Sequence, residues 1–291
     1  MTATMLPAMK APTASALLQR YQLRAKKSWG QNFLVDERAY REITDALRLD
    51  RSSWAVEIGA GLGTLTWRLA EVAGHVVAIE RDRDLCELLR TELGPAREGL
   101  CPIELHEANA LTFDYASIAA RAQQKVALVG NLPYQIASQI LFRLLETPAA
   151  FSRIVVMLQK EMADRIVSKP DHGAYGALSV MLQQAGQVRI VCRVRAGGFL
   201  PAPKVDSAVV ELVPYEHGRV QLADEKLFSR VVHAAFQMRR KTLRNSLAPV
   251  ADDAVLKEAF AATQIDPQRR GETLSVEEFA ALTEALHSRR A

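Results

Sequence analysis

The chain of 291 residues has little cysteine and no long apolar run. Because no stretch of about 18 consecutive apolar residues occurs, the sequence excludes a membrane-spanning helix of ordinary length. The cysteines are scattered, odd in number and without the spacing of metal ligands: Cys86, Cys101 and Cys192. This pattern is atypical of a disulfide scaffold or a zinc site, and it fits a reducing compartment. We therefore expect a cytoplasmic protein without a bound metal.

Acidic residues are missing from two basic segments, residues 1–35 and 230–245, although the net charge of the whole chain is only +4. Clustered positive charge is typical of proteins that bind a polyanion such as nucleic acid. Two solvated surfaces would give the same pattern, so charge alone leaves both interpretations open. The segments hold six residues that we expect to contact a polyanion: Lys26, Lys27, Arg239, Arg240, Lys241 and Arg244.

The order of the predicted elements divides the chain into three parts. Residues 1–24 are rich in Ala, Thr, Met and Pro without a sustained period, which predicts a flexible N-terminal tail. Because this tail is basic and free of acids, an organelle transit peptide is an alternative. Residues 25–216 alternate strands and helices, which predicts an α/β domain. Residues 217–291 predict a small helical domain, too short for a large core of its own.

Seven strands are expected in the α/β domain, with helices between most of them. The last two strands are joined by a short loop and are therefore expected to be antiparallel. The predicted strands are 54–58, 75–79, 102–105, 126–129, 152–158, 187–194 and 208–213. The predicted helices of this domain are 37–48, 64–72, 81–93, 115–123, 136–146, 160–166 and 177–185. Those of the C-terminal part are 224–235, 239–247, 252–260 and 275–287.

A glycine-rich turn follows the first of these strands, with the spacing Glu57-x-Gly59-x-Gly61-x-Gly63. Glycines permit a tight turn and a close approach of the backbone to a ligand. Such a turn by itself is shared by dinucleotide and nucleoside binders. The next strand ends in Glu80, about 20 residues after the glycines, where a carboxylate can hold the hydroxyls of a ribose. The combination favours S-adenosylmethionine over NAD, because no pyrophosphate site is evident.

The residues after strand 126–129 are Gly130-Asn131-Leu132-Pro133-Tyr134. In doubly wound sheets, ligands bind at the carboxyl ends of the strands. The Asn131 side-chain oxygen and the Leu132 carbonyl are two acceptors that can hold the two N–H groups of an adenine N6 amine. Pro133 restricts Leu132 to an extended conformation, which directs that carbonyl. Tyr134 offers a ring face for a base that has left its stack. A strand followed by an ordinary proline turn is the simpler interpretation of this segment alone.

Two further amide positions flank this core of motifs. Gln31 and Asn32 precede the helix predicted at 37–48, where their amides are free to bind a polar ligand or to form a turn. Asn109 follows the strand predicted at 102–105, and it can meet an adenine edge or serve as a turn residue. The residues alone leave both alternatives open.

Together these motifs resemble the ribosomal RNA adenine N6,N6-dimethyltransferases of the kasugamycin-resistance type. The resemblance runs in family order from about Lys26 to Leu247. It rests on the stretches KKSWGQNFLVD, EIGAGLGTLT, AIERD, NALTFDY, NLPYQIASQIL, GGFLPAPKVDSAVV and FQMRRKTLRNSL. It implies a Rossmann-like methyltransferase sheet with a small helical RNA-binding domain, and S-adenosyl-L-methionine as the methyl donor. The implied substrate is a pair of adjacent adenines near the 3′ end of small-subunit ribosomal RNA, in a pre-30S particle, methylated by a monomer.

The resemblance also implies roles for individual residues. The implied cofactor site consists of Asn32, Leu34, Gly59, Gly61, Glu80, Asn109 and Asn131. The implied catalytic set, which orients and stacks the target base, consists of Asn131, Leu132, Tyr134 and Phe199. Asn109 stands where the family usually has Asp. Its amide oxygen can still accept the amino group of the cofactor's adenine, although the change would weaken binding.

Three other functions share part of the pattern. A resistance methyltransferase that acts on one large-subunit adenine has the same N-terminal motifs, but the stretches FLPAPKVDSAVV and FQMRRKTLRNSL favour the small-subunit enzyme. A non-enzymatic RNA- or DNA-binding factor could keep the fold, yet Glu80, Asn131, Pro133 and Tyr134 are all present. A DNA adenine methyltransferase would carry a different tetrapeptide and an inserted recognition segment.

Overall fold

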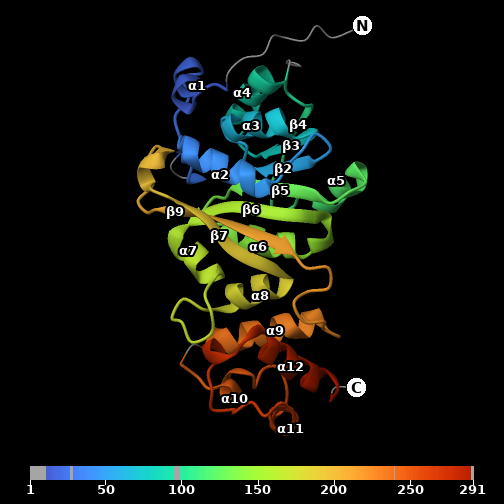
Figure 1. The fold of residues 1–291 in the computed structure, drawn as a ribbon. Helices are drawn as coiled ribbons and strands as arrows, with labels where there is room; N and C mark the ends of the chain where they lie inside the picture. The colour runs from blue at the N-terminus through green and yellow to red at the C-terminus, as the bar shows by residue number, and fades with distance from the viewer. Residues whose placement is uncertain (1–10, 27–28, 95–98, 239, 290–291) are drawn as a thin grey trace. The chain divides into compact units, whose positions relative to one another are not determined.

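The computed structural model describes residues 11–26, 29–94, 99–238 and 240–289 (Figure 1). Lys27 and Arg239 lie outside the described residues. The chain divides into two compact units. The sheet unit comprises the chain up to Ala163 together with Arg189–Pro214, and the helical unit comprises Asp164–Val188 and Tyr215–Ala291. The division differs from the expected single boundary at residue 216, because residues 164–188 group with the C-terminal helices.

The sheet unit contains a seven-stranded sheet in the order β4-β3-β2-β5-β6-β9-β7. Neighbouring strands from β4 to β6 are parallel, and β9 runs antiparallel to β6. This arrangement confirms the α/β prediction with an antiparallel element at the end of the sheet. The strands are β2 (Trp54–Ile58), β3 (His75–Glu80), β4 (Ile103–Glu107), β5 (Val126–Asn131), β6 (Phe151–Gln159), β7 (Gly186–Val194) and β9 (Ser207–Pro214).

Helices of the sheet unit bury apolar side chains against the sheet. Residues of α2 and α3 share one apolar cluster with β5 and β6, which includes Tyr40, Ile43, Leu69 and Val129. The helix starts follow local signals: the Asp36 carboxylate accepts from Arg38 N and Ala39 N and caps α2. The helices are α2 (Glu37–Leu47), α3 (Thr64–Val72), α4 (Arg83–Leu93), α5 (Tyr115–Ala122), α6 (Ala137–Leu145) and α7 (Lys160–Ile166).

A second, two-stranded sheet was not predicted from the sequence. β1 (Phe33–Leu34) pairs antiparallel with β8 (Phe199–Leu200), so that Leu34 lies opposite Phe199. The backbone N–H of Val35 donates to the Gly198 carbonyl at 2.8 Å and extends the pairing. Strands of two residues carry no periodicity that a sequence pattern could reveal.

The expected tail contains a helix. α1 (Ala14–Arg20) has Thr13 as its N-cap and buries Leu17 completely, in an apolar cluster with Leu62, Trp67 and Leu88. At the C-terminal end of α1, Arg20 Nη1 and the Tyr21 hydroxyl each donate to Glu92 Oε1 at 2.7 Å. Residues 14–20 are therefore part of the packed sheet unit, which corrects the prediction of a flexible segment up to residue 24.

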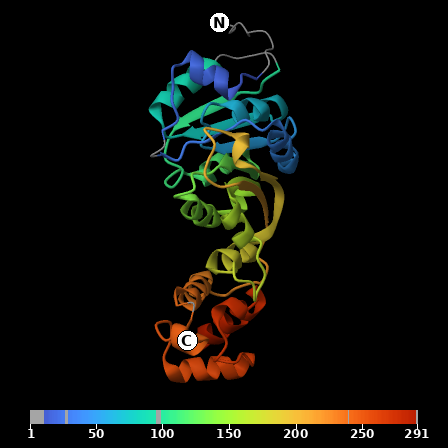
Figure 2. The ribbon, with the colours of Figure 1, turned by 90° about the vertical axis from the view of Figure 1, so that its left-hand side faces the viewer.

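The helical unit packs around an apolar cluster of its own, and its C-terminal helices are orange to red in Figure 2. Val180 of α8 lies in this cluster with Leu227, Phe228 and Phe279, which explains why α8 belongs to this unit. The helices are α8 (Ala177–Ala185), α9 (Glu225–Gln237), α10 (Leu243–Ser246), α11 (Asp253–Thr263) and α12 (Val276–His287). Among the described residues, no helix has the length and apolar character needed to cross a membrane.

Candidate active site

A cavity of about 400 Å³ lies in the sheet unit, where β2, β3 and β5 end. Its size falls in the range of small-molecule sites, about 300–1,000 Å³. The wall includes the glycine turn after β2, the carboxylate at the end of β3, the segment after β5, and residues 29–34. The three motifs that the sequence predicted to share one sheet edge are therefore brought together.

The glycine turn is part of the cavity wall, and its glycines have a left-handed backbone conformation. Gly59, Gly61 and Gly63 have φ values of +72°, +58° and +77°, a conformation that other residues rarely adopt. A Cβ atom on Gly61 would also come within 3.4 Å of the Phe33 ring. The turn thus exposes bare backbone to a ligand, as the sequence predicted, and any side chain here would strain the turn.

Glu80 is a buried carboxylate held by the backbone around it. Its Oε1 accepts from Arg81 N (2.7 Å) and Asp82 N (2.8 Å), and its Oε2 accepts from Gly61 N (2.9 Å). A carboxylate offers roughly four acceptor positions, so one position on Oε2 is left for a ligand hydroxyl. Burial raises the pKa of Glu80, whereas the three N–H donors favour its charged form. The carboxylate is therefore held in place by the backbone and keeps an acceptor position for a ligand hydroxyl.

Glu57 is a second buried carboxyl group in the cavity wall, and its side chain is 2% exposed. Its Oε2 accepts a 2.5 Å hydrogen bond from the Thr66 hydroxyl. Burial raises the pKa of Glu57 to about 8, and the nearby Glu80 charge adds to the effect. The group is thus largely protonated at neutral pH, and a cationic ligand group beside it would favour its charged form. In the sequence, Glu57 was noted only because it precedes the glycine turn at a regular spacing.

Asn131 and Tyr134 are both held in fixed orientations at the cavity. Asn131 Nδ2 donates to the Asn32 carbonyl at 2.9 Å, which leaves the side-chain oxygen of Asn131 as an acceptor. The Tyr134 hydroxyl is hydrogen-bonded to Ser207 Oγ at 2.8 Å, and burial raises the pKa of Tyr134. Leu132 also lines the cavity, and its N–H donates to the Met157 carbonyl at 3.1 Å. These three predicted residues lie together, with the ring neutral and fixed.

Two other predicted amides lie at the cavity with different partners. Gln31 is held by the chain itself, because its Nε2 donates to Asp82 (2.7 Å) and its Oε1 accepts from Lys26 N (2.9 Å). Asn109 lines the cavity, and its Oδ1 accepts from Leu111 N at 3.1 Å. Asn109 therefore makes the turn that the simpler interpretation expected, at a position that still borders the cavity.

Phe199 does not line this cavity, in contrast to its expected role as a second stacking face. Its side chain is 3% exposed and packs in the same apolar cluster as Leu34 and Tyr40. The pairing of β8 with β1 holds it there, and Phe199 borders a separate cavity instead. Leu34 contributes to the walls of both cavities. In this conformation, Phe199 does not line the cavity in which it was expected to stack on the base.

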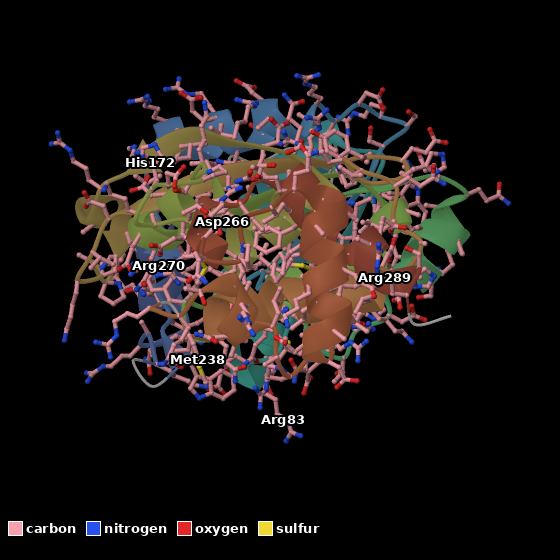
Figure 3. All side chains as sticks on the ribbon, turned by 90° about the horizontal axis from the view of Figure 1, so that it is seen from below. Arg83, His172, Met238, Asp266, Arg270 and Arg289 are labelled. Atoms are coloured by element: carbon pink, nitrogen blue, oxygen red, sulfur yellow. The ribbon has the colours of Figure 1, made fainter. Side chains whose placement is uncertain are left out.

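The basic residues differ in their availability to a polyanion. Arg240 and Lys241 are exposed, and Met238, labelled in Figure 3, precedes them with 54% exposure. Arg244 instead binds Asp253 at 2.9 Å, so the cluster that is free of acids in sequence gains one in space. Lys26 binds Asp82 (2.6 Å) and Asp84 (2.7 Å). Of the four described candidates, Arg240 and Lys241 are thus the ones that no acidic side chain is shown to bind.

The chain is similar to one known protein family over most of its length. A sequence model of the family described as "Ribosomal RNA adenine dimethylase" matches residues 22–288. A ribosomal RNA small subunit methyltransferase A of Anaeromyxobacter sp. (strain K) is 46% identical over 285 residues, which cover 94% of this chain and 98% of the relative. The protein of the same name from Myxococcus xanthus is 45% identical over 273 residues, with 93% and 94% coverage.

Two solved structures share the fold over most of the chain. A dimethyladenosine transferase from Plasmodium falciparum has a TM-score of 0.75 at 23% identity, covering 89% of this chain and 98% of that one. The 23S rRNA methyltransferase ErmE has a TM-score of 0.67 at 27% identity, covering 88% and 100%. The first likeness supports the fold alone, and both agree with a Rossmann-like methyltransferase sheet.

Proposed function

Because the chain belongs to the ribosomal RNA adenine dimethylase family, we propose that its cavity positions S-adenosylmethionine beside a target adenine of small-subunit ribosomal RNA. The enzyme dimethylates the N6 amine of adenine. The observation that carries the assignment of residues is the fixed Asn131 amide, whose oxygen is left as an acceptor next to the glycine turn. We assign Asn131, Leu132 and Tyr134 to the target base.

The cofactor site fits the residues that surround it. Bare backbone at Gly59 and Gly61 lets a ligand approach closely, and the remaining acceptor position of Glu80 suits a ribose hydroxyl. Asn32, Leu34 and Asn109 complete the proposed contacts along the wall. When bound, S-adenosylmethionine supplies an electrophilic methyl group. Glu57, which is largely protonated without a ligand, can lose its proton and balance a cationic group of that ligand.

The proposed mechanism consists of orientation and exclusion of water. The lone pair of N6 is delocalised into the adenine ring, so the amine is a poor nucleophile. Asn131 Oδ1 and the Leu132 carbonyl accept its two N–H groups and turn the lone pair toward the methyl group. After transfer, the N6 centre is acidic and loses a proton readily, so no strong base is required. Removing the target base from its stack in the RNA costs a few kcal/mol. Stacking of that base on Tyr134 offsets about 1–3 kcal/mol of this cost.

The finer substrate is part of the same proposal. We assign the target to two adjacent adenines near the 3′ end of 16S ribosomal RNA, presented in a pre-30S particle in the cytoplasm to a monomer without a metal. The six basic residues named in the sequence support an RNA-containing particle as the partner. Among them, Arg240 and Lys241 are exposed and are the first candidates for phosphate contacts. Incubation of the protein and labelled S-adenosylmethionine with immature small subunits tests this assignment. Label at any position other than these adenines would contradict it.

The first prediction concerns the ribose contact. Glu80→Ala is expected to weaken S-adenosylmethionine binding by about 1.5–3 kcal/mol, because it removes hydrogen bonds to a charged group. Isothermal titration calorimetry measures the change, and circular dichroism confirms that the variant is folded. Glu107→Gln, at the end of the neighbouring strand β4, is the matched control and should bind as the wild type does. Unchanged affinity in Glu80→Ala would remove Glu80 from the site.

The second prediction concerns the RNA contacts. The double variant Arg240→Gln/Lys241→Gln should reduce the log–log salt dependence of RNA binding by roughly one unit for each lost phosphate contact. Filter binding at several salt concentrations measures the slope. Lys226→Gln, an exposed lysine on α9 of the same unit, serves as the control. An unchanged slope with intact cofactor affinity would show that Arg240 and Lys241 are only solvated.

A further inference from the structure

A closed set of hydrogen bonds fastens the segment before α2 to the loop after β3. We call residues 29–35 the strap. Gln31 Nε2 donates to Asp82 Oδ2 at 2.7 Å, and Lys26 N donates to Gln31 Oε1 at 2.9 Å. Lys26 Nζ completes the set by donating to Asp82 Oδ1 at 2.6 Å. The buried Asp82 carboxylate thus binds Gln31 in the strap and Lys26 ahead of it, and so holds the N-terminal end of the strap.

Asp82 is well suited to hold that end in place. Its side chain is almost fully buried, and Oδ1 also accepts from Asp84 N at 3.1 Å, which caps α4. Burial opposes its charge, yet hydrogen bonds from Lys26 and Gln31 hold the pKa of Asp82 below its ordinary value. A buried charge that loses one of its partners is strongly destabilised. The attachment is therefore stiff.

The strap connects this attachment to the reacting groups. Trp29, Gly30, Asn32 and Leu34 of the strap form part of the cavity wall. Asn32, the residue after Gln31, provides the carbonyl that accepts from Asn131 Nδ2 at 2.9 Å. On the other side, the Asp82 backbone N–H donates to Glu80 Oε1 at 2.8 Å. Asp82 thereby contacts the proposed ribose group directly and the catalytic amide through two strap residues.

The two ends of the strap are held independently. At its C-terminal end, Phe33 and Leu34 pair with β8, and Val35 N donates to the Gly198 carbonyl. None of these contacts involves Asp82. Loss of the Asp82–Gln31 bond therefore loosens only the end that carries Trp29 to Asn32, beside the cavity, while the pairing of β1 with β8 remains.

We propose that Asp82 is a positioning residue for methyl transfer, which acts through Gln31 and the Asn32 carbonyl to orient the Asn131 amide relative to Glu80. The proposal rests on the proposed role of Asn131. It predicts that the hydrogen bond between the neutral Gln31 and the charged Asp82 contributes to turnover as well as to cofactor binding. A residue that served only to cap α4 would affect neither once the cap is preserved.

Asp82→Asn and Gln31→Glu separate these roles. Asparagine is as good an N-cap as aspartate, so Asp82→Asn keeps the start of α4. It turns an amide donor toward Gln31, and Gln31→Glu instead sets two carboxylates against each other. In the double variant Asp82→Asn/Gln31→Glu, the new amide donates to the new carboxylate, and the hydrogen bond is restored with donor and acceptor exchanged.

The experiment measures cofactor Kd by calorimetry, and kcat at saturating cofactor and small subunits, for the full chain. Each single variant should raise Kd and lower kcat by about tenfold, the effect of one hydrogen bond to a charged group. The double variant should return both values to within about threefold of wild type, which corresponds to an exchanged bond of similar strength. Arg83→Gln, on the adjacent residue with an 86% exposed side chain, should leave both values unchanged (Figure 3).

Two results would overturn the proposal. Single variants that keep both Kd and kcat near wild type would show that the attachment does not position the site. A double variant no better than the single ones would show that general damage to the fold, instead of the exchanged hydrogen bond, caused the loss. Failure of the proposed function is distinguishable from either result, because the wild-type protein itself would then transfer no methyl group while the Kd comparison still reports on the strap.

Discussion

Asn131→Ala is expected to lower the single-turnover rate of methyl transfer by about 100- to 1,000-fold, the range found when one preorganised polar group is removed from a catalytic site. The variant loses one of the two acceptors that we propose to orient the N6 amine, and an interaction of that kind matters most in the transition state. RNA affinity should change little by comparison. The fold should persist, because Asn131 is only partly buried at the end of β5.

Rapid-quench measurements on small subunits, with RNA and cofactor affinities determined in parallel, check this result. Gln187→Ala removes an exposed amide from β7, outside the cavity wall, and should stay within a few-fold of the wild-type rate. Tyr134→Ala should differ from both variants, because loss of the ring face impairs binding of the base as well as transfer. If Asn131→Ala methylates within a few-fold of wild type, the proposed mechanism is wrong.

Gly130→Val is expected to destabilise the sheet unit and to abolish its activity. Gly130 pairs with Ile58 where β2 lies beside β5. A Cβ atom on Gly130 would come 2.7 Å from the Ile58 carbonyl oxygen and 3.1 Å from Leu132 Cδ2. The contact with the backbone cannot be relieved by a rotamer change, so the strands must separate. Overpacking of this kind costs about 1–3 kcal/mol, and more when backbone must move.

The same displacement would shift the catalytic loop away from the glycine turn, since Gly59 and Asn131 directly follow the paired residues. Thermal unfolding followed by circular dichroism measures the stability, and the single-turnover assay measures the rate. Gly197→Ala places a methyl group in open space and is the matched control. A Gly130→Val protein that unfolds at the wild-type temperature would contradict the close approach of β2 and β5 described here.

The sequence predicted the parts of the site that depend on local order. Runs of buried residues located β2, β3 and β5, and the parallel topology then placed the residues after them at one edge. Gly59, Glu80 and Asn131 could therefore be assigned to one site from the sequence alone. The same logic located α2, because its apolar periodicity and its capping residue Asp36 are contained within one segment.

The remaining features depend on partners that are distant in the chain. The sequence left Gln31 open between a ligand contact and a turn, because its partner Asp82 lies 51 positions away. Arg244 was expected in a cluster free of acids, but folding brings Asp253 to it. Phe199 was assigned to the base, whereas the β1–β8 pairing buries it beside Leu34. Side-chain pairing across such separations leaves no periodic signal in a single sequence.

The pairing of β1 with β8 also orders the events of synthesis. Residues 33–34 leave the ribosome early, whereas their partners at residues 199–200 leave only after six strands of the main sheet have been made. Contacts of such long sequence separation form late, because the loop they close must be ordered first. The wall of the cavity is therefore completed only when nearly all of the sheet unit has been translated. A nascent chain therefore lacks a finished cavity wall until residues 199–200 have been made, with the C-terminal helices still to follow.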